Sequence, residues 1–118
     1  MTIQYFGQTP RLSEATVANG FVFLAGMVPE NTEADATEQT RNVLEQIDHW
    51  LARCGSDKNH ILEATIFLPD MADYDAVNIA WDAWVDPHHT PARACVEAKL
   101  AKPEWKVEIK VSALQIHK

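Results

Sequence analysis

The chain has 118 residues, enough for one domain around one hydrophobic core. Hydrophobic residues make up 47% and charged residues 23%, as in ordinary folded proteins, and the formal net charge is -7. This acidic balance, without any Lys/Arg cluster, argues against a surface that binds nucleic acid.

Membrane insertion and secretion are also disfavoured by the sequence. The longest apolar run, residues 21–28, is too short to cross a bilayer. The N-terminus lacks the basic segment followed by an apolar one that marks a secretory signal. We therefore expect a cytoplasmic protein that contacts neither membrane nor nucleic acid.

The cysteines and histidines show no pattern of a metal site. Without a secretory signal, Cys54 and Cys95 are predicted to be reduced thiols. The five histidines have no metal-ligand spacing with Cys, Asp or Glu, and the adjacent His88 and His89 are interpreted as a loop pair. The four glycines are scattered, so no phosphate-binding loop is indicated. We expect neither a metal nor an organic cofactor.

The N-terminal third predicts a β-hairpin. Asn19 and Gly20 lie between two apolar runs, which is a strong signal for a tight turn between paired strands. Residues 21–25 are apolar at every position instead of alternating with polar residues. This pattern predicts a strand that is buried on both faces.

The middle of the chain predicts a helix, a strand and a second helix. Apolar residues recur at helical spacing over residues 35–54, with Asp35 and Glu38 as a capping pair at the start. Residues 61–68 are rich in β-branched and large apolar side chains, which favour a strand. A second helix is expected over residues 73–85, and its apolar stripe consists of Tyr74, Val77, Trp81, Trp84 and Val85.

The last third predicts two strands, over residues 92–99 and 105–113. The element order is then hairpin, helix, strand, helix, hairpin, which indicates an α+β fold of one domain over residues 1–118. In this fold, two helices pack on one face of a mixed sheet. Because they cover only one face, we expect a partner subunit to cover the apolar residues 21–25 on the other.

Arg93 is an unusual residue for its strand. It stands among small apolar residues, and a guanidinium that is withdrawn from water needs a partner. Strand alternation places Arg93, Cys95 and Glu97 on one face. Glu108 lies on the polar side of the final strand, so the two side chains could approach one pocket if both strands share a sheet. The partner of Arg93 is then either an internal acid such as Glu108 or a ligand.

The chain resembles the RidA/YjgF family of reactive-intermediate deaminases over nearly its whole length, from about residue 13 to 113. The most specific match is the Pro-Ala-Arg-x-Cys-Val segment at residues 91–96, followed by Val-Glu-Ile at residues 107–109. Further matches are FVFLAGMVPE, EQTRNVLEQIDHWL and ILEATIFLPDMADYDAVNIAWDAW. Within the family the chain looks closest to the short, YoaB-like members.

This resemblance implies a fold and an activity. Family members adopt a fold like that of bacterial chorismate mutase and assemble as homotrimers, with ligand sites in the clefts between subunits. They hydrolyse 2-aminoacrylate and related 2-imino acids to 2-keto acids and ammonia. The implied partners of this chain are therefore a small 2-imino or 2-keto acid and two further copies of itself.

The resemblance also implies two catalytic residues. Arg93 matches the arginine that grips the substrate carboxylate, and its planar fork allows bidentate pairing. Glu108 matches the glutamate that positions or activates the attacking water. Cys95 matches a cysteine that lines the cleft, and we favour this lining role over a nucleophile because no sequence signature places a base beside it.

Three further substrate-binding residues follow from the resemblance. Asn78 matches an asparagine of the second helix, and Gly26 matches a glycine beside backbone N–H groups that face the ligand. Ser13 belongs to the family's Tyr-Ser-x-Ala segment, in which Leu12 here replaces the tyrosine. Ala25 replaces the serine of the family's Ser-Gly pair. Both departures leave carboxylate binding in place but make the substrate range uncertain.

Two other functions are kept as alternatives. The missing tyrosine and serine suggest a module that binds a small carboxylate for sensing or regulation and catalyses nothing. RNA cleavage has been proposed for some relatives, but the net charge of -7 disfavours it here.

Overall fold

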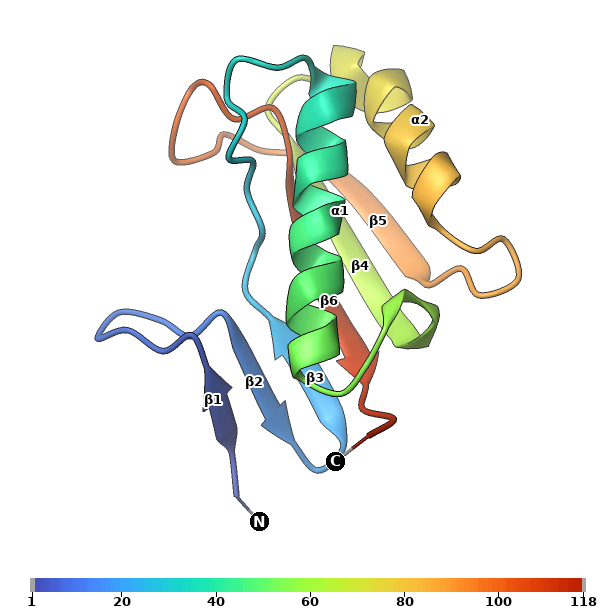
Figure 1. Cartoon of the computed structure of the whole chain (residues 1–118). Coiled ribbons are helices and arrows are strands. Elements are labelled where there is room, and N and C mark those ends of the chain that lie inside the picture. Colours follow the sequence, from blue (N-terminus) through green and yellow to red (C-terminus); the bar gives the residue numbers. More distant parts are fainter. Residues whose placement is uncertain (1, 118) are drawn as a thin grey trace.

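Six strands form one mixed sheet, and both long helices lie on the same face of it (Figure 1). The structure is a computed structural model, and it describes residues 2–117. The strands follow the order β1-β2-β3-β6-β4-β5, and only the β4–β5 pair is parallel. Their bounds are β1 Gln4–Phe6, β2 Ala15–Ala18, β3 Phe21–Leu24, β4 Ile61–Leu68, β5 Ala92–Glu97 and β6 Glu108–Leu114. This is the predicted α+β architecture of a mixed sheet with two helices on one face.

The predicted hairpin is confirmed between β2 and β3. Asn19 and Gly20 both have positive φ angles, 54° and 81°, which suit a tight turn that follows the twist of the strands. Val17 pairs with Val22 across the hairpin, and both are buried on the helix-covered face.

One face of β3 remains uncovered in the single chain, so the predicted burial on both faces is not met there. Val22 and Leu24 are buried under the helices, whereas Phe21 and Phe23 point to the other face and are 42% and 47% exposed. Neither helix reaches that face, because both pack on the opposite side (Figure 1). The open face of the sheet thus presents the aromatic residues for which a covering partner was expected.

The first helix, α1 (Ala36–Arg53), has the predicted cap and apolar stripe. The Asp35 side chain accepts a hydrogen bond from the backbone N–H of Glu38, which satisfies one of the free donors of the first turn. Val43, Ile47 and other stripe residues are fully buried against the sheet. No helix between residues 2 and 117 combines the length and apolarity needed to cross a membrane.

The second helix, α2 (Tyr74–Trp84), packs beside α1 and in front of β5 (Figure 1). Short 3-10 helices precede β4 and α2, at Lys58–His60 and Met71–Asp73. Val77 and Trp81 of α2 are buried, as predicted for its stripe. Tyr74 is 38% exposed, so its assignment to the buried stripe was wrong.

The last two strands do not form the predicted hairpin. β6 lies between β3 and β4, and β5 pairs only with β4, so one strand separates β5 from β6. The chain reaches this position through a long connection over residues 98–107, and β6 begins at Glu108, three residues later than expected. Hairpin signals are local, whereas this crossover depends on pairing with a strand from the middle of the chain.

A buried glutamine of α1 holds the long connection in place. Gln39 is fully buried, and its Oε1 accepts a hydrogen bond of 2.8 Å from the backbone N–H of Lys106. Its Nε2 donates to the carbonyl oxygens of Thr32, Ala34 and Glu104. Because the N–H of Lys106 is bonded to this side chain, the sheet pairing starts only after it.

Candidate functional site

Arg93 lies on the helix-covered side of β5 and makes contact with α2. Its Nη1 donates a hydrogen bond of 2.9 Å to Oδ1 of Asn78, and its Nη2 donates one of 3.2 Å to the Tyr74 hydroxyl. The guanidinium carbon stands 5.2 Å from the ring centre of Trp81 and 5.9 Å from that of Tyr74. No ion pair within residues 2–117 includes Arg93. Its charge is therefore supported by an amide, a phenol and aromatic faces, and no carboxylate neutralises it.

Cys95 lies beside Arg93 on the same face and packs partly against the core. Burial raises the pKa of the Cys95 thiol, and the nearby Arg93 charge offsets this only in part. A raised pKa keeps the sulfur protonated, whereas nucleophilic cysteines have lowered pKa values. The environment thus favours a lining role for Cys95 over a nucleophilic one. Cys95 and Cys54 are both free thiols, as predicted.

Glu108 and Gly26 form a second cluster, at the start of β6. The Glu108 side chain lies directly over the Cα atom of Gly26, where an added Cβ would stand 2.9 Å from the Glu108 carboxyl carbon. Glu108 is half-buried, and burial raises the pKa of its carboxyl above the usual glutamate range, with a smaller opposing effect of Lys110. A carboxylate whose pKa is raised in this way accepts a proton from water more readily than an ordinary glutamate does.

Ser13 belongs to the same end of the sheet as Gly26. The backbone N–H of Ala25 donates a hydrogen bond of 2.9 Å to the carbonyl oxygen of Glu14, so the pairing of β2 with β3 continues beyond the two strands. This extension places the half-buried Ser13 next to the segment that contains Gly26. The predicted residues thus form two groups, one around Arg93 and one around Glu108.

These two groups lie on opposite faces of the sheet, so one chain does not bring Arg93 and Glu108 into one pocket. In β4, Ala64 pairs with Arg93 and points into the helix-covered core. Phe67, three residues later, pairs with Glu108 and has the opposite orientation. The suggestion that the two side chains could approach one pocket is therefore not met within a single chain. Both strands do belong to one sheet, but the register in which each pairs with β4 places the two side chains on opposite faces.

A hollow with a volume of 210 Å³ lies on β4 and β5 and is bordered by Glu63, Ala64, Thr65, Ala92, Arg93 and Ala94. Strand alternation points Glu63, Thr65, Ala92 and Ala94 to the face opposite the Arg93 side chain, so this hollow is not the space around the guanidinium. Neither Asn78 nor Glu108 contributes to it.

Two residues of the Arg93 group, Tyr74 and Trp81, were missed as site residues. Both were assigned to the packing stripe of α2 because they are large and recur at helical spacing with Val77. The signal that could have found them is their position relative to Asn78, which lies four residues after Tyr74 and three before Trp81. Residues at these spacings share one side of a helix.

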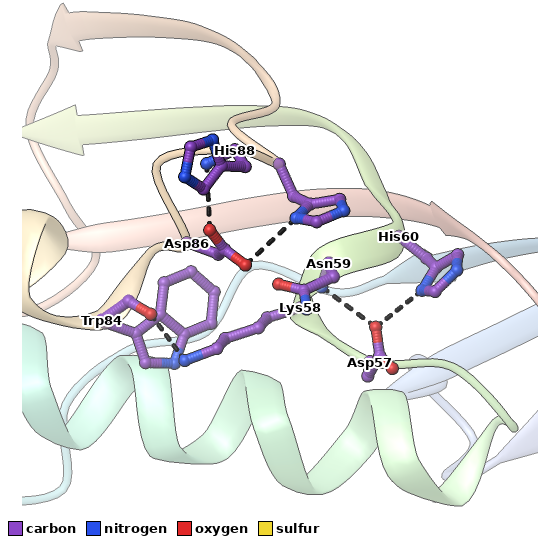
Figure 2. A network of polar contacts seen from close by, with 8 residues as sticks. Asp57, Lys58, Asn59, His60, Trp84, Asp86 and His88 are labelled. Atoms are coloured by element: carbon purple, nitrogen blue, oxygen red, sulfur yellow. Dashed lines mark hydrogen bonds and ion pairs between the residues drawn. The ribbon is translucent and has the colours of Figure 1, made fainter.

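A polar network fixes the loop that joins α2 to β5 (Figure 2). Nζ of Lys58 donates a hydrogen bond of 2.6 Å to the carbonyl oxygen of Trp84, in the last turn of α2. The Asp86 carboxylate accepts one from the backbone N–H of His88 and contacts Nδ1 of His89 at 3.0 Å. The two histidines thus lie in a loop, as predicted. Within residues 2–117, no three side chains of His, Cys, Asp or Glu are grouped so as to hold a metal ion.

The contact between Gly26 and Glu108 leads to a first prediction. Gly26→Ala should displace the Glu108 carboxyl group, because the new Cβ collides with it, and should lower any activity that depends on Glu108 by about tenfold or more. The fold should survive, since the φ angle of Gly26 is not positive and the colliding atoms end a flexible side chain. Melting temperatures of Gly26→Ala alone and combined with Glu108→Ala provide the control. Equal destabilisation in both backgrounds would contradict the collision.

The chain resembles known proteins over nearly its whole length. The family model described as "Endoribonuclease L-PSP" matches residues 2–115. A solved member of the YjgF protein family from Neisseria meningitidis is 63% identical and superposes with a TM-score of 0.96, covering 100% of this chain and 98% of its own.

Two further relatives are similar to the chain over most of its length. The RutC family protein YoaB of Escherichia coli is 50% identical over 113 residues, which are 96% of this chain and 98% of that protein. The 3-aminoacrylate deaminase RutC of Acinetobacter baylyi is 40% identical over 101 residues, 80% of this chain and 79% of that protein. The chain therefore belongs to the RidA/YjgF family, which includes the RutC proteins, and is similar to its YoaB members.

Proposed function

We propose that the protein hydrolyses small 2-imino and 2-enamino acids of the 2-aminoacrylate type to 2-keto acids and ammonia. The observation that carries the proposal is the guanidinium of Arg93, which is held by Asn78 and Tyr74 and has no neutralising carboxylate among residues 2–117. Such a group is ready to bind a substrate carboxylate. Support comes from the relative named as a 3-aminoacrylate deaminase, whose substrate is also a small amino-substituted acid.

The active site is proposed to form between chains of a homotrimer. Arg93 and Glu108 lie on opposite faces of one sheet, so a site that uses both takes them from two copies. The open face around Phe21 and Phe23 offers the apolar surface that such an assembly would cover. The number three comes from the family resemblance described above.

The proposed reaction adds water to the imine carbon and then releases ammonia. The enamine first tautomerises to the imine, whose carbon is electrophilic. Arg93 of one chain holds the carboxylate while Glu108 of the neighbouring chain accepts a proton from water, and the water oxygen bonds to the imine carbon. Glu108 returns that proton to the nitrogen, which gives a carbinolamine. The Glu108 carboxylate then accepts the proton of the new hydroxyl group and passes it to the nitrogen, so the C–N bond breaks and ammonia leaves as the C=O bond forms. This chemistry requires neither a metal nor an organic cofactor.

A mixed assembly of two inactive variants tests the shared site. Arg93→Ala and Glu108→Gln chains carrying different affinity tags are co-expressed, and assemblies with both tags are isolated. In a mixed trimer one of the three sites combines an intact Arg93 with an intact Glu108, so about a third of the wild-type rate is expected. The rate is measured as the decay of an imine that an amino-acid oxidase generates.

The matched control is Arg93→Ala carrying both tags, which should remain inactive. A mixed assembly as inactive as this control would contradict a site shared between chains. A wild-type protein that accelerates no imine decay, across several amino acids, would contradict the deaminase function. If that protein still binds 2-oxobutanoate tightly, it is a carboxylate-binding module.

A further inference from the structure

The Tyr74 hydroxyl has a hydrogen-bond donor that no described residue uses. A guanidinium can only donate, so the 3.2 Å contact between Nη2 of Arg93 and the hydroxyl fixes the phenol oxygen as the acceptor. The phenol hydrogen must therefore point elsewhere. Within residues 2–117 it has no acceptor, and Tyr74 is 38% exposed, so the hydrogen is available to a ligand.

Asn78 also accepts a hydrogen bond from Arg93 and keeps unused donors. Its Oδ1 accepts the hydrogen bond from Nη1 of Arg93, which leaves the two N–H groups of its amide without an acceptor in the same part of the chain. Tyr74 and Asn78 thus each still offer hydrogen-bond donors beside the Arg93 guanidinium. A cluster of donors around one positive charge is complementary to an oxyanion.

We propose that the Tyr74 hydroxyl donates a hydrogen bond to the carboxylate that Arg93 binds, and that Tyr74 is therefore a substrate-binding residue. This inference rests on the carboxylate ligand of the proposed function, but not on its hydrolysis. Tyr74 acts in two ways: its ring stands beside the guanidinium, and its hydroxyl adds one directed donor. The hydrogen bond from the Tyr74 hydroxyl favours a carboxylate over a neutral group, because hydrogen bonds to charged acceptors are stronger than those to neutral ones.

The test compares Tyr74→Phe with wild type in binding 2-oxobutanoate and its neutral amide, 2-oxobutanamide, by calorimetric titration. Phenylalanine keeps the ring and removes only the donor, so the Kd for 2-oxobutanoate should rise about tenfold, and the Kd for the amide less. In imine hydrolysis, KM should rise by a similar factor with little change in kcat. The control is Tyr5→Phe, which alters the other tyrosine, on β1 at the opposite edge of the sheet, and should change neither Kd.

Each outcome decides the inference. An unchanged Kd for 2-oxobutanoate in Tyr74→Phe would overturn it, as would a wild-type protein that binds no 2-keto acid. A rise in Kd that comes with a lower melting temperature or a dissociated assembly would show a structural role and would also overturn it. If wild type hydrolyses no imine but the tenfold difference in Kd remains, the deaminase function fails and the role of Tyr74 stands.

Discussion

Replacing Arg93 with alanine is expected to reduce kcat/KM for 2-imino acids by about a hundredfold or more. The variant loses the guanidinium that is proposed to pair with the substrate carboxylate. The fold should persist, because the guanidinium makes two hydrogen bonds at a part-exposed position and their loss costs about 1 kcal/mol. Steady-state kinetics, with melting temperature and assembly size as checks, measure this result.

Arg93→Lys is the matched variant for this prediction. Lysine keeps the positive charge but not the planar fork, which also contacts Asn78 and Tyr74. We expect its kcat/KM to lie between those of wild type and Arg93→Ala, with most of the loss in KM. Full activity in the folded Arg93→Ala protein would show that another group anchors the carboxylate.

Glu108→Gln is expected to lower kcat by about 10²- to 10⁴-fold while 2-oxobutanoate still binds. Glutamine fills nearly the same space over Gly26 but cannot take a proton from water. Removing a negative charge from the site does not weaken the binding of an anion, so the Kd should stay the same or fall. A large loss of 2-oxobutanoate binding in this variant would contradict the separation of binding at Arg93 from chemistry at Glu108.

Glu108 should make both the activity and the stability of the protein depend on pH. Burial raises the pKa of Glu108, so the activity that needs the ionised carboxylate should fall, as pH decreases, at a higher pH than an ordinary glutamate would give. For stability the sign is reversed. The folded chain binds this proton more tightly than the unfolded chain, so the stability that Glu108 contributes is present at low pH and is lost as pH rises through the folded-state pKa.

This sign gives Glu108→Gln a second measurable effect. Above the folded-state pKa the variant should melt at a higher temperature than wild type, because it carries no buried charge, and the difference should close as pH falls. Melting curves across a pH series measure it. A variant that is less stable than wild type at high pH would show that the Glu108 carboxylate is stabilised in the fold.

The local elements could be predicted from the sequence because their signals lie within them. The capping side chain of Asp35 and the Asn19–Gly20 turn each act over a few residues, and the structure has both. No local sequence signal predicts that β6 lies between β3 and β4. This position depends on which strands pair over long separations, and the adjacency of β5 and β6 in the chain favoured a hairpin instead.

The site shows the same limit. Alternation along one strand correctly placed Arg93 and Cys95 on one face. The relation of Arg93 to Glu108 needed the register of β4, since a shift of one residue exchanges the faces of a strand. Tyr74 was missed for a different reason: tyrosine is both apolar and a hydrogen-bonding residue, so spacing alone cannot separate packing from ligand contact.

The placement of Arg93 and Glu108 on opposite faces has a genetic consequence for the proposed assembly. A chain that lacks only Arg93 still contributes an intact Glu108 to its neighbour, so mixed equally with wild type it silences about half of the sites. A chain that lacks both residues silences the site on each side of it, and about three quarters are lost. In an equal mixture with wild type, the share of lost sites thus equals the mutant fraction for the single defect and exceeds it for the combined one.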